Sequence, residues 1–227
     1  MNRGAGLLLQ ISRMSPLVQR GPPPEPEAKS SPLGRLPGPG SDREIVAALC
    51  AQSPSGGAAL YDRYQRQVRR VLCRVLGHAR DLADLEQETF VSAIRDIASL
   101  KQPDALGAWL TGIAVNRARL ELRRRARRRL FRFSTDEELP EVEAPVASPE
   151  IDEALRATYR ILNKMPADER IAFALRFIDG MELLEVASAC AVSLSTAKRR
   201  LHKARERFDA MAAQYDELSD WAKGSAT

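Results

Sequence analysis

The chain has 227 residues, with 35 Lys and Arg against 30 Asp and Glu, a formal net charge of +5 at pH 7, and an aromatic content of only 5%. This length allows one medium domain or two small ones, and the composition favours an all-α fold of small helical units over a large sandwich or barrel. The excess of basic residues favours a polyanionic partner. Three scattered cysteines and two histidines predict neither a disulfide framework nor a zinc site, so we expect no metal.

Residues 1–40 are dense in Pro, Gly and Ser, which bury too little apolar surface to offset the entropy of ordering, so they are predicted to form a disordered tail. The short apolar patch at Leu7–Ile11 is interrupted by Arg13 and is not interpreted as a signal peptide. No later stretch approaches the roughly twenty apolar residues that cross a bilayer. We therefore expect a soluble, cytoplasmic protein with no membrane insertion.

Helical periodicity begins after Ser41 and predicts a first domain over residues 41–132. A first helix starts at Asp42, "SPSGG" breaks it, and a second helix runs from "AALYDRY" to Gly77. A third helix covers residues 81–100, and a fourth runs from about Asp104 into an arginine-rich half. The expected buried positions of the last two helices are Leu82, Leu85, Phe90, Ile94 and Ile97, then Leu106, Trp109, Leu110, Ile113, Ala114 and Leu120.

Residues 133–152 contain only acidic charges, and Pro140, Pro145 and Pro149 prevent a continuous helix there, which predicts a flexible interdomain linker. Helical periodicity returns over residues 153–212, with breaks at Met165–Pro166, Asp179–Gly180 and Ala191–Val192. These breaks indicate a second small helical domain. Residues 213–227 are interpreted as a C-terminal tail.

The stretch "LLEVASACAVSLSTAKRRLHKARERF" has the spacing of a helix-turn-helix. Ser193 can cap a second helix whose buried side reads Ala197, Leu201, Ala204 and Phe208. The opposite side carries hydroxyl and basic groups suited to phosphates and base edges, and DNA recognition competes there with an ordinary solvated basic helix.

The decapeptide "DLADLEQETF", residues 81–90, is acidic in a basic protein. Asp84, Gln87, Glu88 and Val91 recur at three- and four-residue spacing and share one helical face. Acidic residues near a helix N-terminus complement the helix dipole, so this face alone is more typical of solvation than of a site. Clustered carboxylates also leave a metal-dependent nuclease conceivable as a distant alternative.

The fourth predicted helix ends in a dense run of arginines. They lie almost all around the helix, so they are either a solvated charge face or a largely electrostatic nucleic-acid surface. Neither a Gly-rich phosphate loop, a Ser-His-Asp arrangement nor an HExxH pattern is present, so we expect no enzyme activity and no cofactor.

The order of these parts resembles the extracytoplasmic-function (ECF) group of bacterial sigma factors, within the sigma-70 family. Residues 81–90 match the D-x-x-D-L-x-Q-E-x-F motif of region 2, and residues 153–212 resemble region 4. The resemblance implies that Asp84, Gln87, Glu88 and Phe90 form or support the surface that docks on the β′ clamp helices of core RNA polymerase.

The same resemblance implies two surfaces for promoter DNA. Region 2 would capture an unstacked base of the minus-10 element and follow the opening strand, and region 4 would read the minus-35 element as duplex. The implied minus-10 residues are Lys101, Gln102, Asp104, Asn116, Arg117 and Arg119. The implied minus-35 residues are Thr196, Lys198, Arg199, Arg200, His202 and Lys203.

Two positions depart from the pattern of the family. Ala191 stands where a Gly is usual in the turn, and Ser195 replaces the usual Gly at the start of the recognition helix. The interpretation as an alternative sigma factor also implies an anti-sigma factor that covers the polymerase-binding face. The runner-up is a free-standing helix-turn-helix regulator that binds duplex DNA without polymerase, usually as a dimer.

Overall fold

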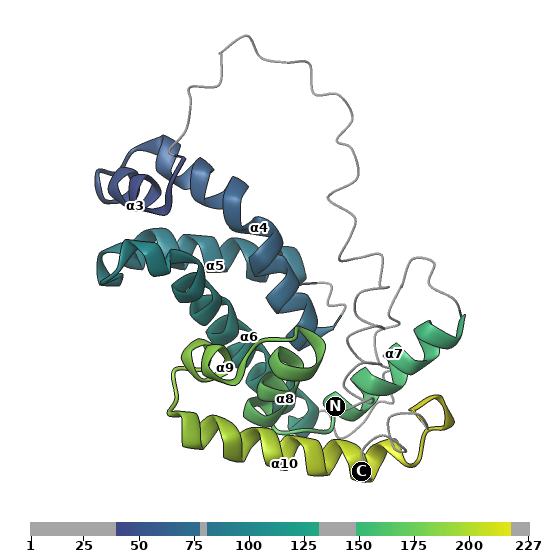
Figure 1. Cartoon of the computed structure of the whole chain (residues 1–227). Coiled ribbons are helices and arrows are strands. Elements are labelled where there is room, and N and C mark those ends of the chain that lie inside the picture. Colours follow the sequence, from purple (N-terminus) through teal and green to yellow (C-terminus); the bar gives the residue numbers. More distant parts are fainter. Residues whose placement is uncertain (1–39, 78–80, 132–148, 219–227) are drawn as a thin grey trace, which may run out of the picture.

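The computed structural model describes residues 40–77, 81–131 and 149–218, and every regular element in these ranges is helical (Figure 1). The first unit contains α3 (Asp42–Cys50), α4 (Pro54–Leu76), α5 (Leu82–Asp96) and α6 (Leu106–Phe131). The second contains α7 (Pro149–Leu162), α8 (Ala167–Phe173), a π-helical turn η3 (Ala174–Ile178), α9 (Leu183–Ala189) and α10 (Leu194–Ala212). Short 3-10 turns cover Ile97–Ser99, Pro103–Ala105 and Asp216–Leu218.

Helix α3 begins where the sequence predicted it, with Ser41 as the N-cap. The Ser41 hydroxyl accepts a hydrogen bond from the Glu44 backbone N–H, and the Glu44 carboxylate accepts from the backbone N–H groups of Ser41 and Gly40. These backbone hydrogen bonds lower the pKa of Glu44. The reciprocal cap satisfies donors that a helix end would otherwise leave without partners.

Helix α4 starts earlier than expected, because only the first residue of "SPSGG" lies outside a helix and the other four begin α4. Pro54 occupies the first helical turn, where a missing N–H costs nothing, and both glycines lie inside the helix. Gly56 is buried against α3, where a Cβ would lie 2.8 Å from the backbone nitrogen of Leu49. The glycine is therefore required for the close packing of α3 on α4.

Two predicted core residues of the first unit are exposed. Ile94 of α5 is 44% exposed and Leu120 of α6 is 49% exposed, so their assignment to the core was wrong. The buried stripe of α6 shifts around the helix to Val115, Ala118 and Leu122, while Trp109 and Ile113 are only half-buried. The stripe moved because α6 contacts both α4 and helices of the second unit.

The breaks predicted in the second unit are confirmed, but its start and end differ. Helix α7 begins at Pro149, inside the predicted linker, because proline is tolerated in the first turn of a helix. At the other end, Leu218 is fully buried and its turn packs on α7, so part of the predicted C-terminal tail belongs to the fold. Residues 1–39 of the tail predicted over residues 1–40, and most of the predicted linker, lie outside the described residues.

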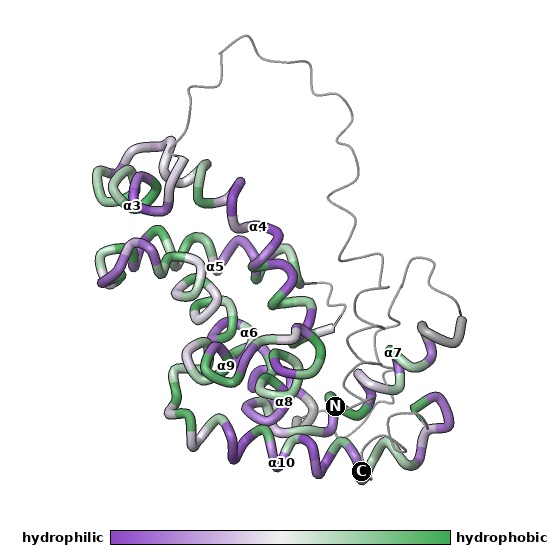
Figure 2. The backbone as a smooth tube through the Cα atoms, viewed as in Figure 1, coloured by the Kyte–Doolittle hydropathy of each residue, from purple (hydrophilic) through white to green (hydrophobic). Residues whose placement is uncertain are grey.

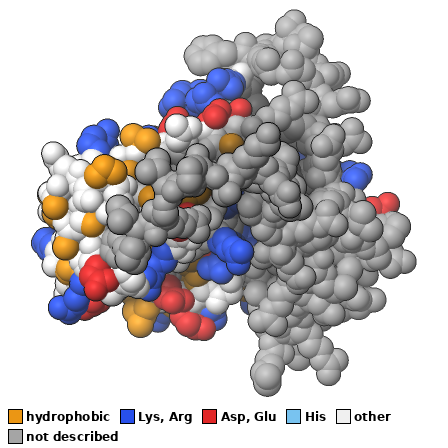
Figure 3. All heavy atoms as spheres, turned by 90° about the horizontal axis from the view of Figure 1, so that it is seen from above, with side chains coloured by type: hydrophobic (Ala, Val, Ile, Leu, Met, Phe, Trp, Pro, Cys, Tyr) orange, Lys and Arg blue, Asp and Glu red, His pale blue; other side chains and the backbone are white. Residues whose placement is uncertain are grey.

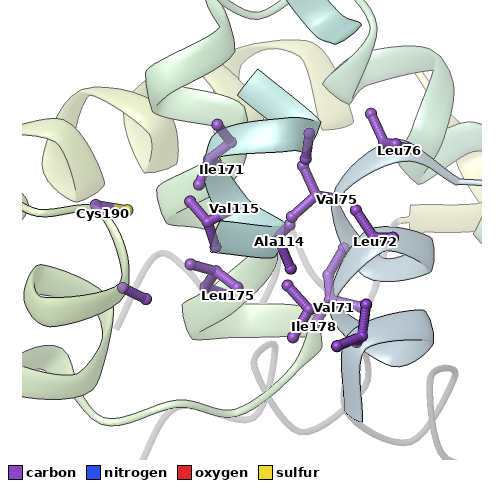
Figure 4. Close-up of a cluster of buried hydrophobic side chains, with 14 of the residues drawn as sticks. Val71, Leu72, Val75, Leu76, Ala114, Val115, Ile171, Leu175, Ile178 and Cys190 are labelled. Atoms are coloured by element: carbon purple, nitrogen blue, oxygen red, sulfur yellow. The ribbon is translucent and has the colours of Figure 1, made fainter. Parts of the chain in front are cut away.

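The two units share one apolar core. Figure 4 shows Val71, Val75 and Leu76 of α4 facing side chains from α6 and from the second unit. The other labelled members are Leu72, Ala114, Val115, Ile171, Leu175, Ile178 and Cys190. Hydropathy alternates along α10 in Figure 2, as expected of a helix with one side packed and the other in water.

The C-terminal turn of α4 is capped by residues of the second unit. The buried Tyr159 hydroxyl lies 3.2 and 3.1 Å from the carbonyl oxygens of Cys73 and Arg74, and Arg170 Nε donates to the Val75 carbonyl at 2.7 Å. Gly77 then leaves the helix at φ 73°, against the Tyr159 ring. Helix-end carbonyls need such donors when water cannot reach them.

An ionic contact lies beside this cap. The carboxylate of Asp179, only 3% exposed, is 3.0 Å from Arg70 Nε and 3.9 Å from Arg74 Nε, both on α4. Burial raises the pKa of Asp179, and the two arginines offset this only in part. The contact therefore fixes how α4 and the second unit fit together more than it raises the free energy of unfolding.

Replacement of Gly56 by Ala should lower the free energy of unfolding by about 1–3 kcal/mol, because the new methyl group would overlap the α3 backbone. Gly57 is the matched control, since a Cβ there would only touch the Ile94 side chain at 3.6 Å. Gly57→Ala should raise stability by up to about 1 kcal/mol through helix propensity. Urea unfolding of both variants tests this, and equal effects would contradict the assigned packing.

Candidate protein-docking and nucleic-acid interfaces

Helix α5 presents an acidic face to solvent. Asp84, Gln87 and Glu88 are exposed, as the helical spacing predicted, whereas Leu85 and Phe90 are buried on the other side. Asp81, at the N-cap position, makes no side-chain capping hydrogen bond. The face is therefore not explained by capping of its own helix.

Exposed apolar side chains border the acidic face of α5. Val91 is 56% exposed, and Ile94 and Tyr61 are each 44% exposed. Phe90 lies beneath them, with its ring 5.0 Å from the Tyr61 ring in an edge-on arrangement, so it supports this surface instead of contacting a partner. Carboxylates mixed with apolar groups suit a protein partner and not a phosphate backbone. Tyr61 was not predicted at this surface, and Ile94 was assigned to the core, although Ile94 follows Gln87 and Val91 at helical spacing.

Part of the predicted minus-10 set gathers around one pocket of about 750 Å³. Lys101 and Gln102 are exposed in the loop before α6, and Asn116 lies on α6 beside the half-buried Trp109. A pocket with an indole ring, an amide and a basic side chain has the groups that stack on and hydrogen-bond an unstacked base. Asp104 is not among the lining residues: it binds Arg43 of α3 through two contacts of 2.8 and 2.6 Å.

Arg117 and Arg119, the two predicted DNA-binding arginines of α6, are already engaged within the protein. Arg117 donates to the Ser92 hydroxyl and lies 3.6 Å from the Glu88 carboxylate of α5. Arg119 lies 2.9 Å from Asp168 of α8 and also donates to the carbonyl of Cys190. The structure thus brings Arg119, with Lys101, Gln102 and Asn116, near the second unit, whereas Arg117 contacts α5.

The arginine run of α6 is partly neutralised by acids. Glu121 is 4% exposed and accepts hydrogen bonds from Arg124 and Arg125 at 2.6 and 2.8 Å. Burial acts to raise the pKa of Glu121, but these hydrogen bonds outweigh it and the pKa is lowered. Arg127 and Arg128 are exposed at the end of the described side chains of this helix. In Figure 3, blue and red side chains likewise lie side by side on the visible surface.

Helices α9 and α10 form the predicted helix-turn-helix. Ser193 caps α10 by accepting from the Thr196 backbone N–H, and the turn is closed by hydrogen bonds from Ala191 and Val192 to the carbonyls of Ser188 and Ala187. Ala191 has φ 53°, which is the left-handed conformation that glycine adopts without strain. The departure noted at this position is therefore accommodated by a strained alanine and not by another turn.

The outer side of α10 carries most of the predicted minus-35 residues. Lys198, Arg199 and Lys203 are exposed, and His202 lies 3.3 Å from Glu206 one turn further along the helix. Thr196 is half-buried, and its hydroxyl accepts a hydrogen bond from the Ser193 hydroxyl. The inner side of α10 packs through residues that include Phe208, whose ring stacks on that of Phe173 with the ring centroids 4.5 Å apart. Arg200 differs from its neighbours, because it is half-buried and lies 3.2 Å from Asp168.

Within the ranges that the structure describes, no three His, Cys, Asp or Glu side chains are grouped as metal ligands. No helix in those ranges is both long and apolar enough to span a membrane.

Comparisons with known proteins identify a family for both helical units. Residues 60–128 match the profile of sigma-70 region 2, and residues 155–208 match that of sigma-70 region 4. The ECF RNA polymerase sigma-E factor of Escherichia coli K12 is 30% identical over 178 residues, which cover 74% of this chain and 93% of that protein. The RNA polymerase sigma-H factor of Pseudomonas aeruginosa is 27% identical, over 74% of this chain and 92% of that protein.

Solved structures share the fold at lower identity. The structure of CnrH in complex with the cytosolic domain of CnrY is 23% identical with a TM-score of 0.52, and covers 77% of this chain and 99% of that one. The sigma factor RpoE in complex with the anti-sigma factor NepR, from Bartonella quintana, is 24% identical with a TM-score of 0.51. That match covers 69% of this chain and 95% of the other.

Glu121→Gln should destabilise the protein by about 1 kcal/mol near neutral pH, because it weakens two charge-assisted hydrogen bonds to partly exposed arginines. The pKa of Glu121 is below its ordinary value of 4.5 in the folded protein, so the contribution is present above that value and is lost as the pH falls below it. Denaturant unfolding between pH 7 and about pH 2 should show the difference between the two proteins shrinking once the pH falls below 4.5. Glu217→Gln, at an exposed position, is the control, and a difference that persists in acid would contradict this.

Proposed function

This chain belongs to the extracytoplasmic-function group of the sigma-70 family, and we propose that it works as an alternative sigma factor through three separate surfaces. The α5 face would bind core RNA polymerase, the loop before α6 and α6 itself would hold the minus-10 element, and α10 would read the minus-35 element. The observation that carries this proposal is the exposed acidic face of α5 in a chain whose basic side chains gather on α6 and α10. As an initiation factor in the cytoplasm, it would act without a reaction of its own.

The α5 face supports protein docking through its mixture of charge and apolar surface. Asp84 and Glu88 would pair with basic side chains of the β′ clamp helices, and Val91 would add apolar contact. Phe90 would hold the helix in place from below through its contact with Tyr61. Charged groups at the rim of such an interface set its orientation and its rate of association.

The minus-10 surface is supported by the pocket beside Trp109. An unstacked base would enter it between Lys101, Gln102 and Asn116, which offer hydrogen-bonding groups at its mouth. Arg117 and Arg119 would contact the strand once their present carboxylate partners are exchanged for phosphates. Asp104 is proposed to act indirectly, because its contacts with Arg43 fix the loop to α3.

The minus-35 surface is the exposed side of α10. Lys198, Arg199 and His202 project from the first half of the helix, where a recognition helix meets base edges in the major groove. Thr196, Arg200 and Lys203 would contact phosphates on either side of that groove. Both solved structures are complexes, one of them with an anti-sigma factor, so a similar inhibitor is proposed for this chain at its polymerase-binding face.

Charge reversal of Asp84 and Glu88 to Lys should weaken binding to core polymerase at least about tenfold, because both side chains would then repel the proposed basic partner. Titration of labelled protein with purified core polymerase measures this. The control reverses Glu153 and Glu217, which are exposed acids of the second unit, and gives the same change in net charge. Equal affinities in all three proteins would rule out the assigned docking face.

Promoter-dependent transcription tests the function as a whole. Core polymerase with this chain should start transcripts at defined sites on genomic DNA, whereas core polymerase alone should not. A chain that bound duplex DNA tightly but ignored core polymerase would support the free-standing regulator instead.

Lys198→Ala and Arg199→Ala should each weaken recognition of a promoter fragment by about 1–3 kcal/mol if the side chain contacts a base, with polymerase affinity unchanged. The salt dependence separates base contacts from phosphate contacts. Loss of a phosphate contact should reduce the slope of log affinity against log salt by about 0.9, and loss of a base contact should leave it unchanged. Unaltered promoter use in both variants would contradict the placement of α10.

A further inference from the structure

A buried carboxylate lies beneath the proposed docking face. Glu86 of α5 is only 6% exposed. The residues one turn before and one turn after it are apolar, since Leu82 packs half-buried against the core and Phe90 is buried. Residues four apart share one side of a helix, so Glu86 interrupts an apolar stripe. It occupies an x of the D-x-x-D-L-x-Q-E-x-F motif, so the motif does not account for it.

Glu86 interacts with α4, the helix that packs along α5 (Figure 1). The Tyr61 hydroxyl donates a hydrogen bond to the Glu86 carboxylate, and the positive charge of Arg69 attracts it. Tyr61 and Arg69 are about two helical turns apart and lie on the same side of α4. The carboxylate is therefore held between the two helices, away from solvent.

The stability of the fold does not explain a glutamate at this position. Burial raises the pKa of Glu86 above its ordinary value of 4.5, and Arg69 and the hydrogen bond from Tyr61 offset this only in part. The ionised carboxylate is therefore less stable in the folded chain than in the unfolded chain at neutral pH. An apolar side chain of similar size would continue the stripe without this cost.

Tyr61 connects Glu86 to the surface. Its side chain is 44% exposed beside Val91 and Ile94, so its ring is part of the apolar border of the docking face. The ring packs edge-on against Phe90 with the centroids 5.0 Å apart, and the hydroxyl is held by Glu86. These two contacts, at the ring and at its tip, fix the orientation of an exposed aromatic side chain. A side chain that is already ordered loses less entropy when a partner binds.

We propose that Glu86 is a positioning residue for polymerase docking, which holds the Tyr61 ring in the orientation that the partner meets. This inference rests on the proposed function. Glu86 has too little exposed surface to serve as a contact itself and acts through Tyr61. The chain gives up some stability for an ordered docking surface, a trade that is common where function and packing compete.

Glu86→Leu separates positioning from a structural role. Leucine continues the apolar stripe but cannot accept a hydrogen bond from Tyr61. The urea midpoint of unfolding should rise by about 0.3–1 M, because a buried carboxylate is removed. Affinity for purified core polymerase should fall about 5- to 20-fold, because the Tyr61 ring is no longer held. A lower urea midpoint, or an affinity within about 2-fold of wild type, overturns the proposal.

Glu86→Gln separates positioning from negative charge. The amide oxygen still accepts from the Tyr61 hydroxyl, so affinity for core polymerase should return to within about 3-fold of wild type. A loss as large as that of Glu86→Leu would mean that the charge itself is needed, against the proposal. Glu217→Leu, at an exposed position of the second unit, makes the same chemical change elsewhere. It should leave core affinity unchanged, and an equal loss there would also overturn the proposal.

Tyr61→Phe tests whether Glu86 acts through the hydroxyl. This variant keeps the ring and should weaken core binding about as much as Glu86→Leu does. The double variant should bind no more weakly than either single one, because both substitutions remove the same contact. Losses that multiply in the double variant would contradict the assigned role.

The wild-type chain separates this inference from the proposed function. If it does not bind core polymerase, the proposed function fails for every variant alike. If it binds, and Glu86→Leu binds equally well, only the role of Glu86 is wrong and the docking face stands.

Discussion

The last turn of α4 ends inside the protein, and most of the arrangement of the two units depends on this. Its carbonyl groups at Cys73, Arg74 and Val75 meet the Tyr159 hydroxyl and the Arg170 guanidinium of the second unit. An unsatisfied buried carbonyl costs about 1–3 kcal/mol, so the second unit stabilises the helix that organises the first. The apolar contacts around this turn then place α8 and α9 against α6.

The charges of the protein fall into two groups with different environments. Some cations are bound by acids of the same chain, as Arg124 and Arg125 are by Glu121, and contribute to the fold. Others, such as Lys198 and Arg199, are exposed and stay available to an outside polyanion. Pairing with acids of the same chain therefore reduces the positive charge that α6 presents to solvent, whereas Lys198 and Arg199 of α10 keep theirs.

Local features of the fold were predictable because they depend on residues close in sequence. The Ser41 cap, the breaks of the second unit and the exposed face of α5 follow from helical spacing and capping chemistry. Helix starts at Pro54 and Pro149 were not predicted, because the same residue that interrupts a helix is acceptable in its first turn.

The relation between the units could not be predicted from these patterns. The contact of Arg119 with Asp168 joins residues 49 apart, and that of Arg170 with Val75 joins residues 95 apart. Periodicity shows which side of a helix is apolar but not which helix covers it. For the same reason the core positions of α6 were misplaced at Leu120, since its surroundings come from two units.

The pairing of Arg119 and Arg200 with Asp168 also bears on how related chains can diverge. A side chain that binds one group inside the protein and is proposed to bind DNA as well is constrained by both contacts. Substitution of either arginine would therefore disturb the fold as well as the proposed DNA binding. Exposed residues such as Lys198, Arg199 and His202 contribute less to packing within the protein. Under the proposed function, new promoter preferences would therefore evolve on the outer side of α10 while its inner side stays fixed.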